Sequence, residues 1–72
     1  LMRGMTYVFI NSTGGSHPFE IRTTNGGSAY TDGVSGSKTG TQFFTVPMNA
    51  PNTLYYQCTA HSNMGNTMNI VT

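Results

Sequence analysis

The chain is organised around residues 54–65, which read LYYQCTAHSNMG. Leu54, Tyr56 and Cys58 alternate with their neighbours, and this period of two predicts a short β-strand, residues Leu54 to Cys58, that carries these three side chains on one face. The strand ends at the only cysteine of the chain, where a short polar loop begins.

A second strand is predicted at Thr6–Asn11, TYVFIN, near the start of the chain. Its alternation places Tyr7 and Phe9 on one face and Val8 and Ile10 on the other. Because both faces are apolar, we expect this strand to lie inside a sandwich of two sheets.

A third strand is predicted at His17–Thr23, after a cluster of turn-forming residues at Ser12–Ser16. The segments Thr6–Asn11 and His17–Thr23 are therefore expected to form a hairpin. Its second strand has one apolar face and one solvated face, which consists of Pro18, Glu20 and Arg22.

The remaining chain continues this all-β pattern. Thr24–Gly40 is rich in Gly, Ser and Thr, and we expect it either to cross between two sheets or to form a functional loop, with Tyr30 as its apolar anchor. Thr41–Val46 and Met68–Val71 are further strands, and the proline-containing segment Pro47–Thr53 turns the chain between strands. With no convincing helix, the fold class is a small Greek-key β-sandwich.

Length and composition exclude several classes of protein. The 72 residues form one domain, expected to be a module of a longer chain, and the formal net charge of +1 comes from scattered side chains. Nucleic acid is therefore not an expected partner. The longest apolar run, Tyr7–Ile10, is far shorter than the ~20 residues of a membrane span. Cys58 cannot close a disulfide within the chain, so any additional stabilisation of this small domain must come from a metal, a partner or a neighbouring chain.

The number of chain reversals places the candidate metal ligands His17 and Cys58 at one end of the fold. If Thr6–Asn11 runs upward, His17 begins a descending strand, and Cys58 ends an ascending one. Both side chains then lie at the same end. Cys58, His61 and Met64 follow at positions i, i+3 and i+6 of one loop.

Two imidazoles, one thiolate and one thioether are the ligand set of a blue-copper centre. Zinc is a competitor, but structural zinc prefers four Cys or His ligands. Haem attachment of the c type needs a second cysteine before the histidine. A cysteine nucleophile with a histidine base is a further alternative, although no residue is placed in the sequence as an obvious orienter of the base.

Each of these residues also has a plainer interpretation. Cys58 fits a buried core position, His17 a turn, His61 a loop and Met64 a gap in the core. The conjunction of all four at one end favours metal binding. The sequon Asn11-Ser12-Thr13 is discounted, because Asn and Ser are common in turns.

The sequence resembles the cupredoxin family, and its ligand loop Cys58-x-x-His61-x-x-Met64 looks like the short loop of amicyanins. Over nearly the whole chain it is similar to cupredoxin-like modules of structural and appendage proteins of marine bacteriophages and of some marine bacterial proteins. The residues that carry this resemblance are Arg3-Gly4, Thr6-Tyr7, Phe9, His17-Pro18-Phe19, Tyr30-x-Asp32-Gly33-Val34, Val46-Pro47, Ala50-Pro51 and Leu54-Tyr55-Tyr56-Gln57-Cys58.

The resemblance implies one copper ion, cycling between Cu(I) and Cu(II), with His17, Cys58 and His61 as ligands and Met64 as the weak axial ligand. It implies outer-sphere electron transfer rather than enzymatic turnover, with either a transient redox protein or neighbouring domains of a larger assembly as partner. An extracytoplasmic or virion location fits both. The alternative is a structural module of a phage virion or surface protein, in which the copper site is vestigial or only stabilising.

Two positions depart from the family pattern. Family members begin with a further strand before the position of Leu1, so we expect an unpaired sheet edge. Many electron-transfer members follow the first histidine with Asn, whose backbone N–H bonds the cysteine sulfur. Pro18 has no N–H, which predicts a lower reduction potential.

Overall fold

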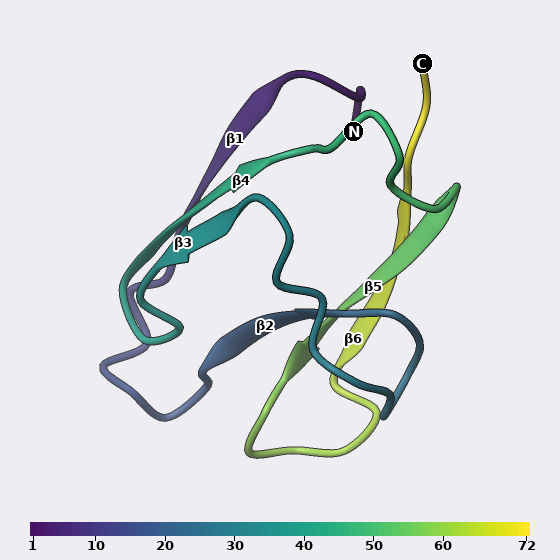
Figure 1. Ribbon diagram of the computed structural model, residues 1–72. Helices are drawn as coiled ribbons and strands as arrows, with labels where there is room; N and C mark the ends of the chain where they lie inside the picture. Colours follow the sequence, from purple (N-terminus) through teal and green to yellow (C-terminus); the bar gives the residue numbers. More distant parts are fainter.

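The computed structural model describes residues 1–72 and contains six β-strands and no helix. The strands form two three-stranded antiparallel sheets, with the orders β1-β4-β3 and β2-β5-β6 (Figure 1). The fold is thus a small all-β sandwich, as the alternation of side chains predicted. The strands are β1 (Thr6–Ile10), β2 (Phe19–Arg22), β3 (Val34–Gly36), β4 (Thr41–Thr45), β5 (Thr53–Cys58) and β6 (Gly65–Asn69).

The predicted hairpin of Thr6–Asn11 with His17–Thr23 is wrong. β1 pairs with β4 and β2 pairs with β5, so the chain leaves one sheet after β1 and enters the other at β2. The physical reason lies in the aromatic side chains. Phe9 of β1 and Phe19 of β2 stack with their ring centroids 5.0 Å apart, which partly buries both rings between the sheets instead of along one sheet.

The segment Thr24–Gly40 returns the chain to the first sheet, which confirms the predicted crossover. Tyr30 anchors it, since its ring meets Phe44 of β4 edge-on with centroids 6.1 Å apart. The short strand β3 within this segment was not predicted, because its Gly- and Ser-rich composition carries little strand signal.

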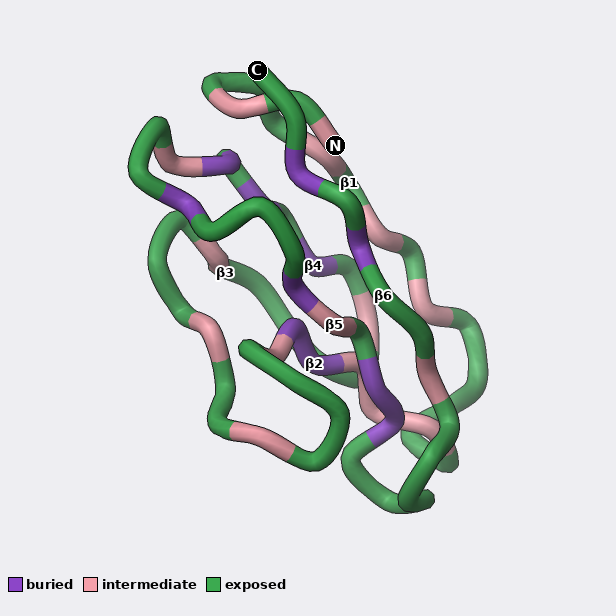
Figure 2. Tube along the Cα trace, turned by 90° about the vertical axis from the view of Figure 1, so that its right-hand side faces the viewer, coloured by how far each residue is buried: buried purple, intermediate pink, exposed green.

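The core lies between the two sheets and draws on both (Figure 2). Only one face of β1 contributes to it: Tyr7 and Phe9 pack against the core, whereas Val8 and Ile10 are exposed. The prediction that both faces of this strand are buried is therefore wrong, because no element covers the outer face. The buried cluster consists of Ile21, Phe44, Val46, Ala50, Leu54, Met68 and Ile70.

Glu20 is a second correction, since it is buried rather than part of a solvated face. Its carboxylate accepts a hydrogen bond from Arg22 at 2.7 Å and pairs with Lys38. The hydrogen bond from Lys38 holds the pKa of Glu20 below its usual value, burial opposes this effect, and Arg22 adds to the lowering. Two cations thus make the burial of this carboxylate tolerable.

The last strand begins earlier than predicted, at Gly65 instead of Met68, because the whole segment pairs with β5. After β6 the chain meets its own beginning: Arg3 N–H donates to the Val71 carbonyl and Val71 N–H donates to the Leu1 carbonyl, both at 2.8 Å. β1 and β6 are edge strands of their respective sheets. The structure contains no helix with the length and apolar character needed to cross a membrane.

Candidate metal centre

The pairing of β2 with β5 brings the first histidine to the cysteine. Phe19 and Cys58 are partners in this ladder, and His17 precedes Phe19 by two residues. A hydrogen bond from Thr59 N–H to the Pro18 carbonyl, 3.0 Å long, extends the pairing beyond the strand ends. The prediction that His17 and Cys58 share one end of the fold is confirmed.

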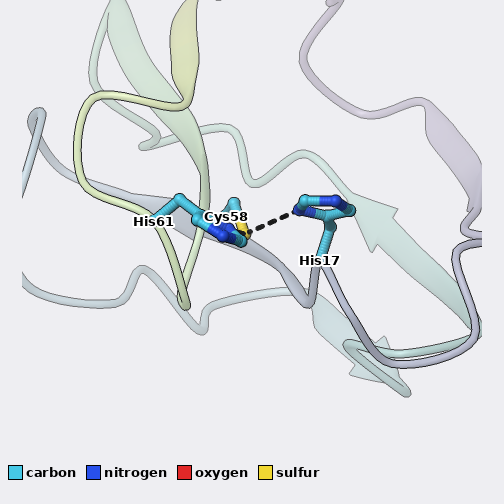
Figure 3. Close-up of side chains that lie close together, drawn as sticks. All are labelled: His17, Cys58 and His61. Atoms are coloured by element: carbon cyan, nitrogen blue, oxygen red, sulfur yellow. Dashed lines mark hydrogen bonds between the residues drawn. The ribbon is translucent and has the colours of Figure 1, made fainter.

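The three strongest candidate ligands converge on one point (Figure 3). The Cys58 Sγ lies 3.3 Å from His61 Nδ1 and 3.7 Å from His17 Nδ1. The two imidazole rings are tilted, with centroids 4.8 Å apart. His17 comes from the β1–β2 connection, Cys58 from the end of β5 and His61 from the following loop, so three separate segments supply one cluster.

These separations suit a shared metal ion. Ligand bonds of about 2.0 Å to nitrogen and about 2.3 Å to sulfur, opened by about 100–120°, place the two ligand atoms roughly 3.3–3.7 Å apart. The two observed nitrogen-to-sulfur distances lie at the ends of this range. Both histidines present Nδ1 to the sulfur, and all ligand atoms of the cluster lie within 4.8 Å of one another. This donor set could hold a single metal ion.

Burial divides the cluster into an inner and an outer part. Cys58 is buried, His17 is half-buried and His61 is exposed. The sulfur is thus shielded from solvent, whereas one imidazole reaches the surface of the protein. Water exclusion around a thiolate protects it and strengthens its interaction with a cation.

Met64 approaches the cluster through its backbone. Its carbonyl accepts a 2.8 Å hydrogen bond from Cys58 N–H, which closes the ligand loop. The Met64 side chain is partly exposed and, with His17 and Cys58, lines an open cleft of about 650 Å³. The role of its sulfur as a fourth ligand stays a prediction.

The ligand loop is braced by residues that the sequence analysis missed. Asn63 lies between His61 and Met64 with a φ of +62°, a left-handed conformation that Asn tolerates better than most residues. Its Oδ1 accepts a 3.1 Å hydrogen bond from Asn25 Nδ2 in the β2–β3 connection. The preference of Asn for this conformation is the only local signal that could have drawn attention to it.

A second brace acts on the residue before the cysteine. The Gln57 side chain is buried, and its Oε1 accepts a 2.8 Å hydrogen bond from Gly26 N–H. The turn around Asn25 and Gly26 therefore holds both the end of β5 and the ligand loop. Fixed surroundings of this kind limit how far ligands move when the charge of a bound ion changes.

Comparison of the chain with protein-family models, with curated proteins and with solved structures found no match. The fold and the site consequently define the class: a small all-β sandwich with a His-Cys-His cluster that could hold a metal ion.

Proposed function

We propose that this protein is a cupredoxin-like domain that binds one copper ion and transfers single electrons. The observation that carries the proposal is the placement of two imidazole nitrogens beside one buried thiol, at 3.3 and 3.7 Å. Two histidines and one cysteine around a single ion are the core of a blue-copper site.

The donor set favours copper over zinc. The cluster contains three His and Cys side chains, and the chain has no further residue of either type. A closed structural zinc site would need a fourth such ligand. Met64 lines the same cleft as His17 and Cys58 and offers a soft thioether, which could hold copper as a weak fourth ligand.

The cysteine-nucleophile alternative lacks support in the hydrogen bonds. A catalytic histidine needs a third group that orients its ring. Neither imidazole here has a hydrogen-bond partner other than the Cys58 sulfur. Glu20, one of two carboxylate side chains, is engaged by Arg22 and Lys38. We therefore propose no enzymatic reaction for this site.

The mechanism assigns each ligand a distinct task. Copper, when bound, supplies a one-electron couple between Cu(I) and Cu(II). Cys58 holds its buried sulfur at the centre of the cluster, and His17 supplies one side of the site from the β1–β2 connection. His61 presents the exposed imidazole edge at which a partner protein docks. The small net charge of the chain suits weak, transient docking better than strong electrostatic steering.

Addition of Cu(II) to the purified protein tests the proposal. An intense thiolate-to-copper absorption band in the visible is expected, followed by bleaching on reduction. Cys58→Ser should abolish the band, and Met64→Leu should keep the band but shift the reduction potential. Absence of the band in the parent protein would refute a copper–thiolate site. A band that neither reductant nor oxidant alters would support a stabilising role in a larger assembly instead.

Thermal unfolding gives an independent measurement. An ion that binds only the folded state stabilises it by about 2.7 kcal/mol at a free concentration 100 times Kd. The parent protein should gain this stability with Cu(I), supplied anaerobically, and Cys58→Ser should gain much less. Equal shifts in both proteins would show that the ion binds elsewhere.

A further inference from the structure

Asn11, the residue that follows β1, has a side chain with an unusually complete set of hydrogen bonds. Its Nδ2 donates to the His17 carbonyl at 2.8 Å and to the Lys38 carbonyl at 3.1 Å. Its Oδ1 accepts from Thr13 N–H at 3.1 Å and from the Thr13 hydroxyl at 2.7 Å. Both amide hydrogens and both lone pairs of the carbonyl are therefore used.

This pattern also determines the orientation of the amide. The two carbonyl oxygens can only accept, so they must face Nδ2, and the Thr13 N–H can only donate, so it must face Oδ1. No other side chain of similar size supplies two donors on one branch and an acceptor on the other. Aspartate has the same shape but would set a carboxylate oxygen against two carbonyl oxygens.

The backbone around the first histidine depends on this side chain. Pro18 has no N–H to donate, and the His17 N–H makes no hydrogen bond within the protein. The His17 carbonyl accepts one short hydrogen bond, from Asn11, and one long contact of 3.5 Å, from the Thr13 hydroxyl. Asn11 thus provides the principal polar contact that fixes the His17 backbone.

The third segment in this arrangement is the β3–β4 turn. The Lys38 carbonyl accepts from Asn11 Nδ2 and also from Phe19 N–H, at 2.7 Å. Asn11 N–H donates to the Gly40 carbonyl at 3.0 Å, which ties Asn11 to the same turn. The end of β1, the start of β2 and this turn are therefore joined at Asn11, directly behind His17.

We propose that Asn11 is a positioning residue for the candidate metal site, which holds His17 Nδ1 at ligand distance from the Cys58 sulfur. The effect on metal binding rests on the proposed function, whereas the hydrogen bonds from Asn11 to the His17 and Lys38 carbonyls (the Asn11 clamp) belong to the metal-free protein. In the sequon Asn11-Ser12-Thr13, both hydrogens of Nδ2 are engaged inside the fold, so Nδ2 is not free to accept a glycan in the folded protein.

The test compares Asn11→Asp with Asn66→Asp. Asn66 lines the same cleft, and its Oδ1 accepts from Thr67 N–H, which aspartate can also do. Both variants add one negative charge at the cleft, but only the first loses donors to His17. With Co(II) as a spectroscopic probe, Asn11→Asp should bind roughly 10- to 100-fold more weakly and show an altered thiolate-to-cobalt spectrum. Asn66→Asp should differ from the parent protein by less than about threefold.

Thr13→Val provides a milder version of the same change. It removes the hydroxyl donor to Asn11 Oδ1 and the long contact to the His17 carbonyl and keeps both donations from Nδ2, so a smaller loss of affinity in the same direction is expected. This variant keeps the proposal testable if Asn11→Asp does not fold. Unchanged affinity and spectrum in Asn11→Asp, or equal losses in Asn11→Asp and Asn66→Asp, would overturn the proposal.

Measurements on the metal-free protein separate this inference from the proposed function. NMR contacts between the His17 ring and the Cys58 side chain should be present in the parent protein and weakened in Asn11→Asp. If the parent protein binds no metal but these contacts still depend on Asn11, the clamp stands and the copper function fails. If the contacts are the same in both proteins, the positioning role is refuted whatever the metal result.

Discussion

The close approach of Gly65 to β5 makes Gly65→Ala a severe perturbation of a single residue. Gly65 begins β6 and pairs with Gln57. A Cβ at this position would lie 2.9 Å from both Gln57 Cα and the carbonyl carbon of Tyr56, and closer still to the Tyr56 carbonyl oxygen. Carbon atoms in contact are normally about 3.5–4.0 Å apart. The new methyl group therefore meets backbone, which cannot rotate away as a side chain can.

The cost follows from what must move. β5 is the central strand of its sheet, so β6 has to separate from it. This opens the neighbouring hydrogen bonds, including the 2.8 Å bond from Cys58 N–H to the Met64 carbonyl. Overpacking costs about 1–3 kcal/mol, and each lost hydrogen bond about 1 kcal/mol. We expect a loss of about 3 kcal/mol, a large part of the roughly 4–11 kcal/mol typical of a domain of this size.

Thermal and urea unfolding followed by circular dichroism measure this loss. For a domain of 60–100 residues, a loss of 3 kcal/mol lowers Tm by roughly 12–24 °C. The matched control is Gly40→Ala, where the new Cβ would lie 3.7 Å from the Ser37 Cβ, an ordinary contact. The control should change Tm by only a few degrees. A Tm of Gly65→Ala within a few degrees of the control would refute the argument that close strand approach requires glycine here.

Three further predictions concern the ion pairs, the core and the sulfur environment. Because its two cations lower the pKa of Glu20, the carboxylate stabilises the fold above its unfolded-state pKa near 4.5, and this stability is lost as the pH falls through the folded-state pKa. Urea unfolding between pH 7 and pH 3 should therefore show a weaker pH dependence for Glu20→Gln than for the control Asp32→Asn, and equal slopes would contradict it. Leu54→Ala, at a fully buried position, should cost about 2–5 kcal/mol in the same assay, and a loss below 1 kcal/mol would show that the core refills the space. If the site is cupredoxin-like, as proposed, Pro18→Asn should raise the reduction potential of the copper-loaded protein by supplying the N–H that family members donate to the thiolate, and an unchanged or lower potential would count against that donor.

Several features of the fold were predictable because they are local. Alternation of apolar side chains located five of the six strands, with β3 missed and β6 starting earlier than predicted, since successive side chains of a strand point to opposite faces. The spacing of Cys58, His61 and Met64 defined one compact loop, because three ligands within seven residues cannot lie far apart. The reversal count placed His17 beside that loop, and the structure confirms it with a 3.7 Å approach to the sulfur.

Other features depended on contacts between distant segments. The same alternation in β1 is compatible with pairing to β2 or to β4, because every strand offers the same backbone groups to a partner. In the structure β1 pairs with β4, and the stacking of Phe9 on Phe19 between the sheets favours this arrangement. The alternation of residues 17–23 predicted an exposed Glu20, but in the structure it is buried and pairs with Lys38 from the crossover segment.

The sequence by itself thus determined an all-β chain with an unpaired cysteine and its candidate ligand loop, because strand periodicity and ligand spacing are properties of neighbouring residues. Only the tertiary structure decided which strands pair and which carboxylate is buried. It also decided that the Asn11 side chain joins the His17 carbonyl to the Lys38 carbonyl of the β3–β4 turn. These depend on hydrogen bonds and packing between segments that are separated along the chain, and no local pattern encodes which distant group will meet a given donor or ring.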